Sequence, residues 1–260
     1  MDILLTNDDG IDATGLLAVY ESLSDVGEVT VVAPADDQSA VGRQMSAQVT
    51  LHEHELGYSV EGTPTDCVVA GIGALELDPD IVVAGCNRGA NLGHYVLGRS
   101  GTVSAAVEAA FFGIPAMAVS LYFPGTVGRY EEFDPGVEEY AEPARAARFL
   151  LSHALGAGVF DHADYLNVNA PLPPETGHAP MTITTPSHVY DVDAARKESG
   201  DVEIIDRIWE QMAAEDIPDP EGTDRRTVVD GEVSVSPLTA PHTTERHEGL
   251  DALGHTYPEI

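Results

Sequence analysis

Two adjacent carboxylates follow the first apolar run of the chain, at the point where a predicted strand ends. Residues 3–5 are Ile-Leu-Leu, which predicts a short buried strand, and Asn7, Asp8, Asp9 and Gly10 follow it without a linker. Like charges a few ångströms apart repel and raise each other's pKa, so a bound divalent cation is the simplest compensation. The alternative is an Asx-rich turn, in which Asn7 and Asp8 hydrogen-bond nearby backbone and Gly10 takes a positive φ. These residues alone favour neither interpretation.

Two more oxygen-bearing side chains follow later predicted strands. Ser39 comes after the second strand and Asn87 after the third. The carboxyl ends of parallel strands share one edge of a sheet, where open α/β folds bind ligands, so we expect both residues to meet Asp8 and Asp9 there. Carboxylate, hydroxyl and amide oxygens suit magnesium, manganese or calcium better than zinc. The pattern therefore predicts a site for a hard divalent cation, with positions left open for water and a substrate oxygen.

A candidate phosphate site lies at the start of a strongly predicted helix, where Ser100, Gly101 and Thr102 follow one another. Unpaired backbone N–H groups and the helix dipole at such a terminus hold phosphate even in an acidic protein. Arg88 and Arg99 flank this loop and would supply positive charge. The alternative is structural, since Ser100 or Thr102 could simply cap the helix.

The same glycine-rich stretch carries two further candidates. Asn91, close to Asn87, could bind substrate or only brace the loop. His94 is a weaker candidate for proton transfer, because a loop histidine is more often simply exposed. The pattern alone assigns neither residue.

Alternating strand and helix signals predict the elements that position these residues. The predicted strands are short apolar runs at 28–33, 80–84, 116–121 and 165–169. The predicted helices lie at 15–24, 102–111 and 137–155, and another starts at Thr63 and Pro64. Residues 46–61 are typical of a hairpin. Strand–helix–strand order implies right-handed parallel units, so this part of the chain predicts an α/β fold with a mainly parallel sheet.

The periodic signal weakens in the C-terminal third. Residues 181–184 and 232–236 alternate as strands do. Residues 215–224 are acidic and contain two prolines, which predicts an exposed loop. We expect this third to be a small extension or an oligomerisation arm.

The charge of the chain is its most unusual bulk property. Its 260 residues are 43% hydrophobic, enough for one sizeable core, but 44 acidic residues against 12 basic ones give a formal net charge of −32. Such a surface repels phosphate backbones and anionic membranes, so we expect neither nucleic acid nor membrane as a partner. The acids are scattered along the chain, which favours adaptation to high salt over a single functional acidic patch.

Cysteine usage and hydropathy give further expectations. Cys67 and Cys86 have no Cys-x-x-Cys spacing, so they indicate neither a zinc site nor a disulfide framework, and we expect buried or near-site thiols. The N-terminal residues resemble a strand and not a secretory signal, and no apolar run is long enough to span a membrane. We therefore expect a cytoplasmic protein.

Five segments in order resemble the successive signatures of the SurE (survival protein E) family, which consists of metal-dependent 5'/3'-nucleotidases. They are TNDDG at 6–10, VVAPADDQSAVG at 31–42, GTPTDCV at 62–68, GCNRGANLG at 85–93 and SGTVSAAVE at 100–108. Weaker likeness continues in LNVNAP at 166–171 and GEVSVSPL at 231–238. Five motifs in the same order are more specific than a single glycine-rich match. Together with the acidic composition, the resemblance indicates a family member from a halophilic archaeon.

The resemblance implies a fold, a ligand set and an assembly. It implies a Rossmann-like three-layer sandwich, with a catalytic core at 1–175 and a C-terminal extension at 176–260 that completes the fold and mediates oligomerisation. In the family the matching aspartates, serine and first asparagine bind one divalent metal ion per subunit, most often magnesium or manganese. Family members exchange C-terminal segments, so a homodimer or homotetramer is implied. The residues that match the metal ligands are Asp8, Asp9, Ser39 and Asn87.

The same resemblance implies a substrate and departs from the family pattern at one position. Nucleoside monophosphates are the expected substrates, and some family members also act on 3'-nucleotides or short polyphosphate. Arg99 stands before the Ser-Gly-Thr turn, where relatives often carry tyrosine or histidine, so the contacts of the phosphate pocket are not carried over. Residues 185–225 match too loosely for any role to be transferred.

The mechanism that follows as a hypothesis is metal-assisted hydrolysis of a phosphomonoester. Asp8 or Asp9 would accept or relay a proton from the attacking water. The remaining phosphoryl oxygens would be held by four residues of the glycine-rich loop and the helix start, namely Asn91, Ser100, Gly101 and Thr102. A covalent aspartyl-phosphate route usually places its two acids one residue apart, whereas here they are adjacent.

Two hypotheses from other classes remain open. A non-enzymatic, Rossmann-type nucleotide-binding module would need a GxGxxG turn after the first strand, and NDDGIDATG supplies only Gly10 and Gly15. A metal-buffering or interaction protein would use the acidic surface itself. Release of phosphate from a nucleotide, with and without metal, separates both from the enzyme.

Overall fold

The computed structural model describes residues 1–125, 133–240, 242 and 248. The predicted extension at 176–260 therefore lies partly outside the described residues. No helix in the described part of the chain is both long and apolar enough to cross a membrane.

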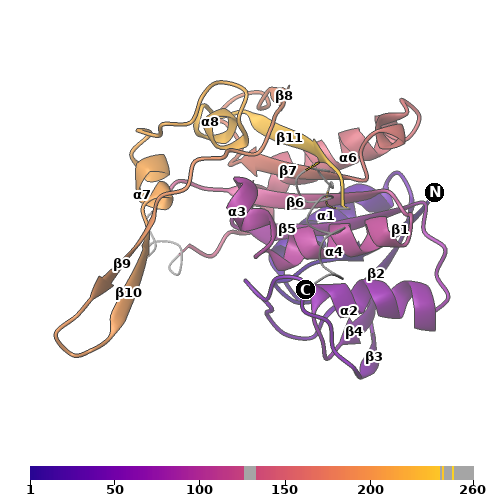
Figure 1. The fold of residues 1–260 in the computed structure, drawn as a ribbon. Coiled ribbons are helices and arrows are strands. Elements are labelled where there is room, and N and C mark those ends of the chain that lie inside the picture. The colour runs from indigo at the N-terminus through magenta and orange to yellow at the C-terminus, as the bar shows by residue number, and fades with distance from the viewer. Residues whose placement is uncertain (126–132, 241, 243–247, 249–260) are drawn as a thin grey trace.

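A nine-stranded sheet forms the centre of the molecule, in the order β3-β4-β2-β1-β5-β6-β7-β11-β8 (Figure 1). All neighbouring strands are parallel except the β3/β4 and β7/β11 pairs. These strands are β1 (Asp2–Thr6), β2 (Glu28–Pro34), β3 (Leu51–His54), β4 (Gly57–Val60), β5 (Ile81–Arg88), β6 (Ala116–Tyr122), β7 (Tyr165–Pro171), β8 (Met181–Ile183) and β11 (Val233–Leu238). The predicted mainly parallel sheet and the hairpin within 46–61 are confirmed.

Helices cover both faces of this sheet, as the prediction of a three-layer sandwich requires. One buried cluster lies beneath α1 and α6, and a second lies beneath α2 and α4. The helices are α1 (Thr14–Ser24), α2 (Pro64–Val69), η1 (Ala70–Ala74), α3 (His94–Leu97), α4 (Gly101–Phe111), η2 (Val137–Tyr140), α6 (Ala141–His153), η3 (Val159–Asp161), α7 (Ile208–Ala213) and α8 (Asp224–Val229). Because both faces are covered, the central strands are apolar on both sides and not alternating.

The strand order places a topological switch between β1 and β5. The chain leaves β1 through α1 to reach β2 on one side, and β5 pairs with the other side of β1. In open α/β sheets the crevice at the carboxyl ends of such a strand pair is the usual ligand site. Asp8 and Asp9 follow β1 and Asn87 lies near the end of β5, so both segments meet at this crevice.

Strand β5 runs farther than the sequence predicts. The expected strand ends at Ala84, whereas β5 continues to Arg88 after a shift in its register with β6 between Ala84 and Asn87. Gly85 makes the irregularity feasible, since its φ is +129° and a Cβ at this position would lie 2.1 Å from the backbone oxygen of Val119. Such bulges re-aim side chains next to active sites, and here the bulge precedes Asn87 directly.

Local capping signals are confirmed at α2. Thr63 is the N-cap, Pro64 is the first helical residue, and a capping box joins Thr63 to Asp66. Burial and the hydrogen bonds donated by backbone N–H groups act in opposite directions on the Asp66 carboxyl, and the net result is a lowered pKa. Helix α4 begins at Gly101 with Ser100 as its N-cap, so the cap is Ser100 and not Thr102.

The C-terminal third both completes the sheet and projects from it. Strand β11 inserts between β7 and β8, and the two-stranded hairpin of β9 (Val192–Arg196) and β10 (Val202–Asp206) extends away from the body (Figure 1). The prediction that residues 215–224 form an exposed loop is wrong in part. Asp219 and Asp224 are buried, because they accept hydrogen bonds from a buried arginine and from backbone N–H groups.

Candidate functional site

One cavity at the carboxyl edge of the sheet brings the ends of three predicted strands together. Asp8, Ser39 and Asn87 all line it, together with Asn91 and Ser100. Its volume is about 390 Å³, which is sufficient for a small organic ligand. Residues far apart in sequence therefore share one site, as the topology predicts.

Asp8 lies against the N-terminus of α4. The Thr102 hydroxyl donates to its Oδ1 at 2.6 Å, and a Cβ on Gly101 would lie 2.8 Å from the Asp8 Cβ, so only glycine allows this approach. Burial, and secondly the charge of Asp9, raise the pKa of Asp8, and the Thr102 hydrogen bonds oppose both effects, so that the resulting pKa is about 7. A carboxyl group with this pKa can either hold a proton or bind a cation near neutral pH.

Asp9 lies beside Asp8 but turns toward β5. Its Oδ2 accepts the Arg88 backbone N–H at 2.8 Å, and it does not line the cavity. Burial raises the pKa of Asp9, and the Arg88 N–H partly offsets the effect. Asp9 is thus held next to Asn87 by the strand that carries Asn87.

Ser39 and Asn87 each donate a hydrogen bond within the protein, and each keeps a side-chain oxygen that can accept from or coordinate a ligand. The Ser39 hydroxyl donates to Asp37 Oδ1 at 2.6 Å, which orients its lone pairs. The Asn87 Nδ2 donates to the backbone oxygen of Gly89 at 2.5 Å, whereas its Oδ1 accepts no hydrogen bond from any described residue. Both oxygens are available to an electrophile in the cavity.

This donor set fits a hard cation. Asp8 and Asp9 are adjacent and largely buried. Burial raises the pKa of both carboxyl groups, and the backbone N–H and positive charge of Arg88 offset this only in part at Asp9. Nowhere in the described part of the chain do three histidine, cysteine, aspartate or glutamate side chains gather around one point. A metal ion at this position would be held by a mixed set of carboxylate, hydroxyl and amide oxygens, which suits magnesium or manganese.

Fewer residues form the phosphate side of the cavity than the sequence predicts. The Ser100 oxygen accepts the N–H of Val103 at 3.1 Å, which leaves its own O–H free to donate. The N–H of Gly101, at the first helical position, has no acceptor within its helix. Thr102 is turned toward Asp8, and neither Gly101 nor Thr102 is part of the cavity lining, so of the predicted phosphate residues only Asn91 and Ser100 line it. Arg99 lines the cavity and adds a positive charge.

Asn91 is firmly held where it lines the cavity. Its N–H donates to the Asn169 Oδ1 at 2.8 Å, and its carbonyl accepts from Asn167 at 2.8 Å. Its Nδ2 donates to Ser120 at 3.0 Å and to Thr102 at 3.4 Å. A phosphate oxygen would compete with these two hydroxyls for the amide protons.

Two candidates of the sequence analysis lie away from the cavity. His94 stacks on His188 with ring centroids 4.1 Å apart and does not line the cavity. The Arg88 side chain donates to the backbone oxygen of Phe133 at 3.1 Å. Both expected thiols, Cys67 and Cys86, are buried.

The cavity also has an aromatic part, which the sequence does not predict. Tyr122, Phe123 and Trp209 line it, the first two at the end of β6 and the third on α7. A signal for Trp209 does exist, since the only tryptophan of the chain stands between Ile208 and Met212 in an otherwise polar region. The sequence does not locate Trp209 in the fold, because it does not predict which other element packs against the segment around this residue.

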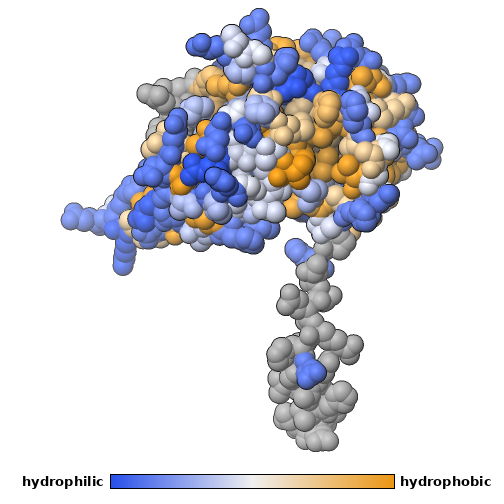
Figure 2. All heavy atoms as spheres, turned by 90° about the horizontal axis from the view of Figure 1, so that it is seen from above, coloured by the Kyte–Doolittle hydropathy of each residue, from blue (hydrophilic) through white to orange (hydrophobic). Residues whose placement is uncertain are grey.

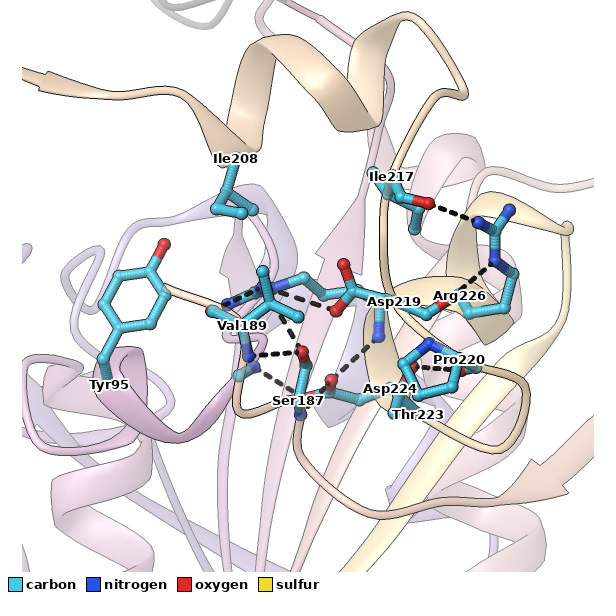
Figure 3. A network of polar contacts seen from close by, with 12 residues as sticks. Tyr95, Ser187, Val189, Ile208, Ile217, Asp219, Pro220, Thr223, Asp224 and Arg226 are labelled. Carbon is cyan, nitrogen blue, oxygen red and sulfur yellow. Dashed lines mark hydrogen bonds and ion pairs between the residues drawn. The ribbon is translucent and has the colours of Figure 1, made fainter. Parts of the chain in front are cut away.

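A buried polar network supports the loop that carries Asn91 (Figure 3). Asp224 accepts the N–H of Gly93 at 2.6 Å and the N–H of Ser187 at 2.9 Å. Arg225 is 0% exposed, donates to the Val189 carbonyl at 3.0 Å and lies 3.4 Å from an oxygen of Asp219. The segment before α8 is thereby fixed to the loop between β5 and α4.

A mainly parallel α/β sheet, with a cavity lined by carboxylate, hydroxyl and amide oxygens at its switch point, defines a Rossmann-like protein. The chain belongs to the SurE family, since the family model described as Survival protein SurE matches residues 3–191.

Relatives of this family align along the whole chain. The chain is 70% identical over 257 residues to the 5'-nucleotidase SurE of Natronomonas pharaonis, covering 99% of this chain and 100% of the relative. It is 65% identical to the 5'-nucleotidase SurE of Haloarcula marismortui, covering 98% and 94%. Both organisms are halophilic archaea, as the acidic composition predicts. The crystal structure of the SurE protein from Aquifex aeolicus is similar with a TM-score of 0.73 at 29% identity, covering 100% of both chains.

Proposed function

We propose that this protein is a metal-dependent phosphomonoesterase that hydrolyses nucleoside monophosphates to nucleoside and phosphate. The observation that carries the proposal is the meeting of Asp8, Ser39 and Asn87 with the start of α4 in one cavity. An oxygen donor set beside free N–H and O–H donors suits a phosphoryl group better than a carboxylate or an amide. The relatives carry the name 5'-nucleotidase SurE, which supports the same substrate class.

In this proposal four side chains hold one divalent ion, magnesium or manganese. They are Asp8, Asp9, Ser39 and Asn87. When bound, the ion would polarise a phosphoryl oxygen and lower the pKa of the attacking water. Because Asp9 does not line the cavity, it would hold the ion only after turning from the Arg88 N–H, or through a water molecule.

The protein's own groups would orient the phosphate and move the proton. Ser100 and the N–H of Gly101 would donate to phosphoryl oxygens, and Arg99 would add charge. Thr102 would act through Asp8, and Asn91 would contribute if its amide exchanged one of its hydroxyl acceptors for a phosphate oxygen. The proton of the attacking water would pass to Asp8 or Asp9, because a base works best when its pKa is near the working pH.

Three further properties belong to this proposal: hydrolysis of 3'-nucleotides, a cytoplasmic location and an oligomeric state. Hydrolysis of 3'-nucleotides would use the same site with the sugar reversed. A cytoplasmic location and a homodimer or homotetramer stay predictions. The projecting β9/β10 hairpin supports assembly, since Val202 and Ile204 on it are 57% and 69% exposed.

Phosphate release from 5'-AMP and 3'-AMP, with magnesium, with manganese and with a chelator, tests the proposal. The assay uses the full chain in high potassium chloride. We expect release that requires the metal and that falls by at least about a hundredfold in Asp8→Asn and in Asp9→Ala, because each loses a charged ligand.

A matched control lies on the same loop. Asp12→Asn also removes one carboxylate, but the Asp12 side chain is 88% exposed and lies outside the cavity. We expect it to keep full activity. Tight nucleotide binding without any release of phosphate would contradict the enzyme and indicate a nucleotide-binding module.

A further inference from the structure

The cavity has two chemically different parts. The part formed at the ends of β1, β2 and β5 is polar, with Asp8, Ser39 and Asn87. The part formed at the end of β6 and by α7 is aromatic, with Tyr122, Phe123 and Trp209. A phosphate alone would use only the polar part, so the aromatic part is unexplained by the chemistry of hydrolysis.

Helix α7 is anchored so that Trp209 stays at the cavity. Ile208 and Met212, on the two sides of Trp209, are each 1% exposed and belong to one buried cluster with Tyr122. Trp209 itself is only partly buried and packs against that cluster. Its neighbours therefore hold the helix, while part of the indole remains accessible from the cavity.

The polar network gives α7 a second anchor. Tyr95 donates to Asp206 at 2.7 Å, two residues before α7, and the Arg225 guanidinium lies 5.2 Å from the Tyr95 ring. On the other side of α7, Arg226 donates to the Ile217 carbonyl at 2.7 Å. Both ends of the α7 segment are thus tied to the body, so Trp209 is a fixed wall of the cavity in this chain.

We propose that Trp209, with Tyr122 and Phe123, forms the subsite for the nucleobase of the substrate. The inference rests on the proposed function, because it takes the phosphate to lie at Asp8 and Ser100. An indole face can stack on any purine or pyrimidine, because every base has a π-face. Trp209 is then a specificity-determining residue that distinguishes nucleotides from sugar phosphates.

The single tryptophan makes a direct binding experiment possible. All tryptophan fluorescence of the chain comes from residue 209. The full chain in high potassium chloride with magnesium is titrated with AMP, adenosine and ribose 5-phosphate. We expect a saturable fluorescence change with AMP and with adenosine, and none with ribose 5-phosphate. A fluorescence signal that AMP leaves unchanged while AMP is hydrolysed would overturn the subsite and leave the proposed function intact.

Variant kinetics provide the second measurement. Trp209→Leu should raise KM for AMP roughly tenfold relative to KM for ribose 5-phosphate, and Trp209→Phe should restore most of the loss, because phenylalanine keeps an aromatic face. Phe149→Leu is the matched control, since Phe149 is 49% exposed on α6 and outside the cavity. An equal change of both KM values in Trp209→Leu would contradict a base subsite.

The two proposals fail in different ways. If neither phosphate ester is hydrolysed under any metal condition, the proposed function fails. The fluorescence titration then still decides the subsite, because a saturable response to AMP supports it and no response overturns it.

Discussion

The carboxyl group of Asp8 is under three opposing influences. Burial and the neighbouring Asp9 favour its protonated form, the hydroxyl of Thr102 favours the charged form, and the net result is a pKa of about 7. A cation must displace the proton to bind. Affinity of the proposed site for metal should therefore fall as the pH drops below about 7, because an increasing fraction of Asp8 is protonated.

Thr102→Val tests this balance with little change in shape. Loss of the hydroxyl removes a group that lowers the pKa of Asp8, so the pKa rises and metal binding needs a higher pH. Affinity for magnesium or manganese is measured by titration calorimetry at a series of pH values. We expect the pH at which binding is half-maximal to rise by roughly one unit, because the free energy of a hydrogen bond to a charged group corresponds to a pKa shift of about that size.

Ser104→Ala is the control for that substitution. Ser104 is a buried hydroxyl on the same helix, and it donates to the carbonyl of Ser100 at 2.6 Å without contacting Asp8. The pH midpoint of metal binding in Ser104→Ala should match that of the unmodified protein. An unchanged midpoint in Thr102→Val would mean that Thr102 does not tune Asp8.

At the scale of elements, α8 and the loop between β5 and α4 depend on one another. Asp224, at the first position of α8, receives the N–H of Gly93 although 131 residues separate them. The same carboxylate receives Ser187 and Arg225 N–H groups at 2.9 and 2.8 Å. The loop that presents Asn91 to the cavity is therefore supported by a segment from the C-terminal third.

Asp224→Ala should be among the most destabilising single substitutions. It leaves three buried N–H groups without their acceptor and removes one of the carboxylates around Arg225, which typically costs about 3–5 kcal/mol. We expect a loss of this size in the free energy of unfolding, measured by denaturant titration. Amide exchange in residues 89–99 should also accelerate, since Gly93 loses its partner.

Asp230→Ala provides the comparison from the other end of α8. The Asp230 side chain is 52% exposed and pairs with Arg226 at 3.7 Å, so its removal should cost less than about 1 kcal/mol. Similar losses in the two variants would show that the buried network does not support the loop.

At the scale of the whole molecule, charge repulsion is a general influence. The formal net charge is −32. On the face seen in Figure 2, hydrophilic residues predominate on the side of the hairpin, and hydrophobic residues gather on the side away from it. Like charges destabilise the compact state more than the expanded chain. Salt shortens the Debye length from about 10 Å at 0.1 M to about 3 Å at 1 M, which reduces this repulsion.

The thermal midpoint should therefore rise with potassium chloride, most steeply below about 1 M, when followed by circular dichroism. A variant with Glu53, Glu55 and Glu198 changed to glutamine gives the control, because these acids are exposed and form no ion pair in the described part of the chain. Its midpoint should be higher than that of the unmodified protein in low salt and equal to it in high salt. A midpoint independent of salt would rule out repulsion as the main influence.

The sequence alone determined the features that depend on near neighbours along the chain. Apolar runs identified the central strands, and Thr63 with Pro64 identified the start of α2. The parallel topology then brought Asp8, Ser39 and Asn87 to one edge, because strand ends in such a sheet share a direction. These inferences need only local pattern and connectivity.

Only the tertiary structure decided which polar groups are buried and what they contact. Acidic residues and prolines at 215–224 predict exposure, yet Asp219 and Asp224 are buried. Asp224 accepts the N–H of the distant Gly93, and Asp219 pairs with Arg225, which is itself buried. Likewise, Thr102 is turned to Asp8 and Trp209 faces the cavity, which no spacing along the chain reveals. Burial of a charge is stable only where a partner exists, and that partner is fixed by the folded chain and not by sequence proximity.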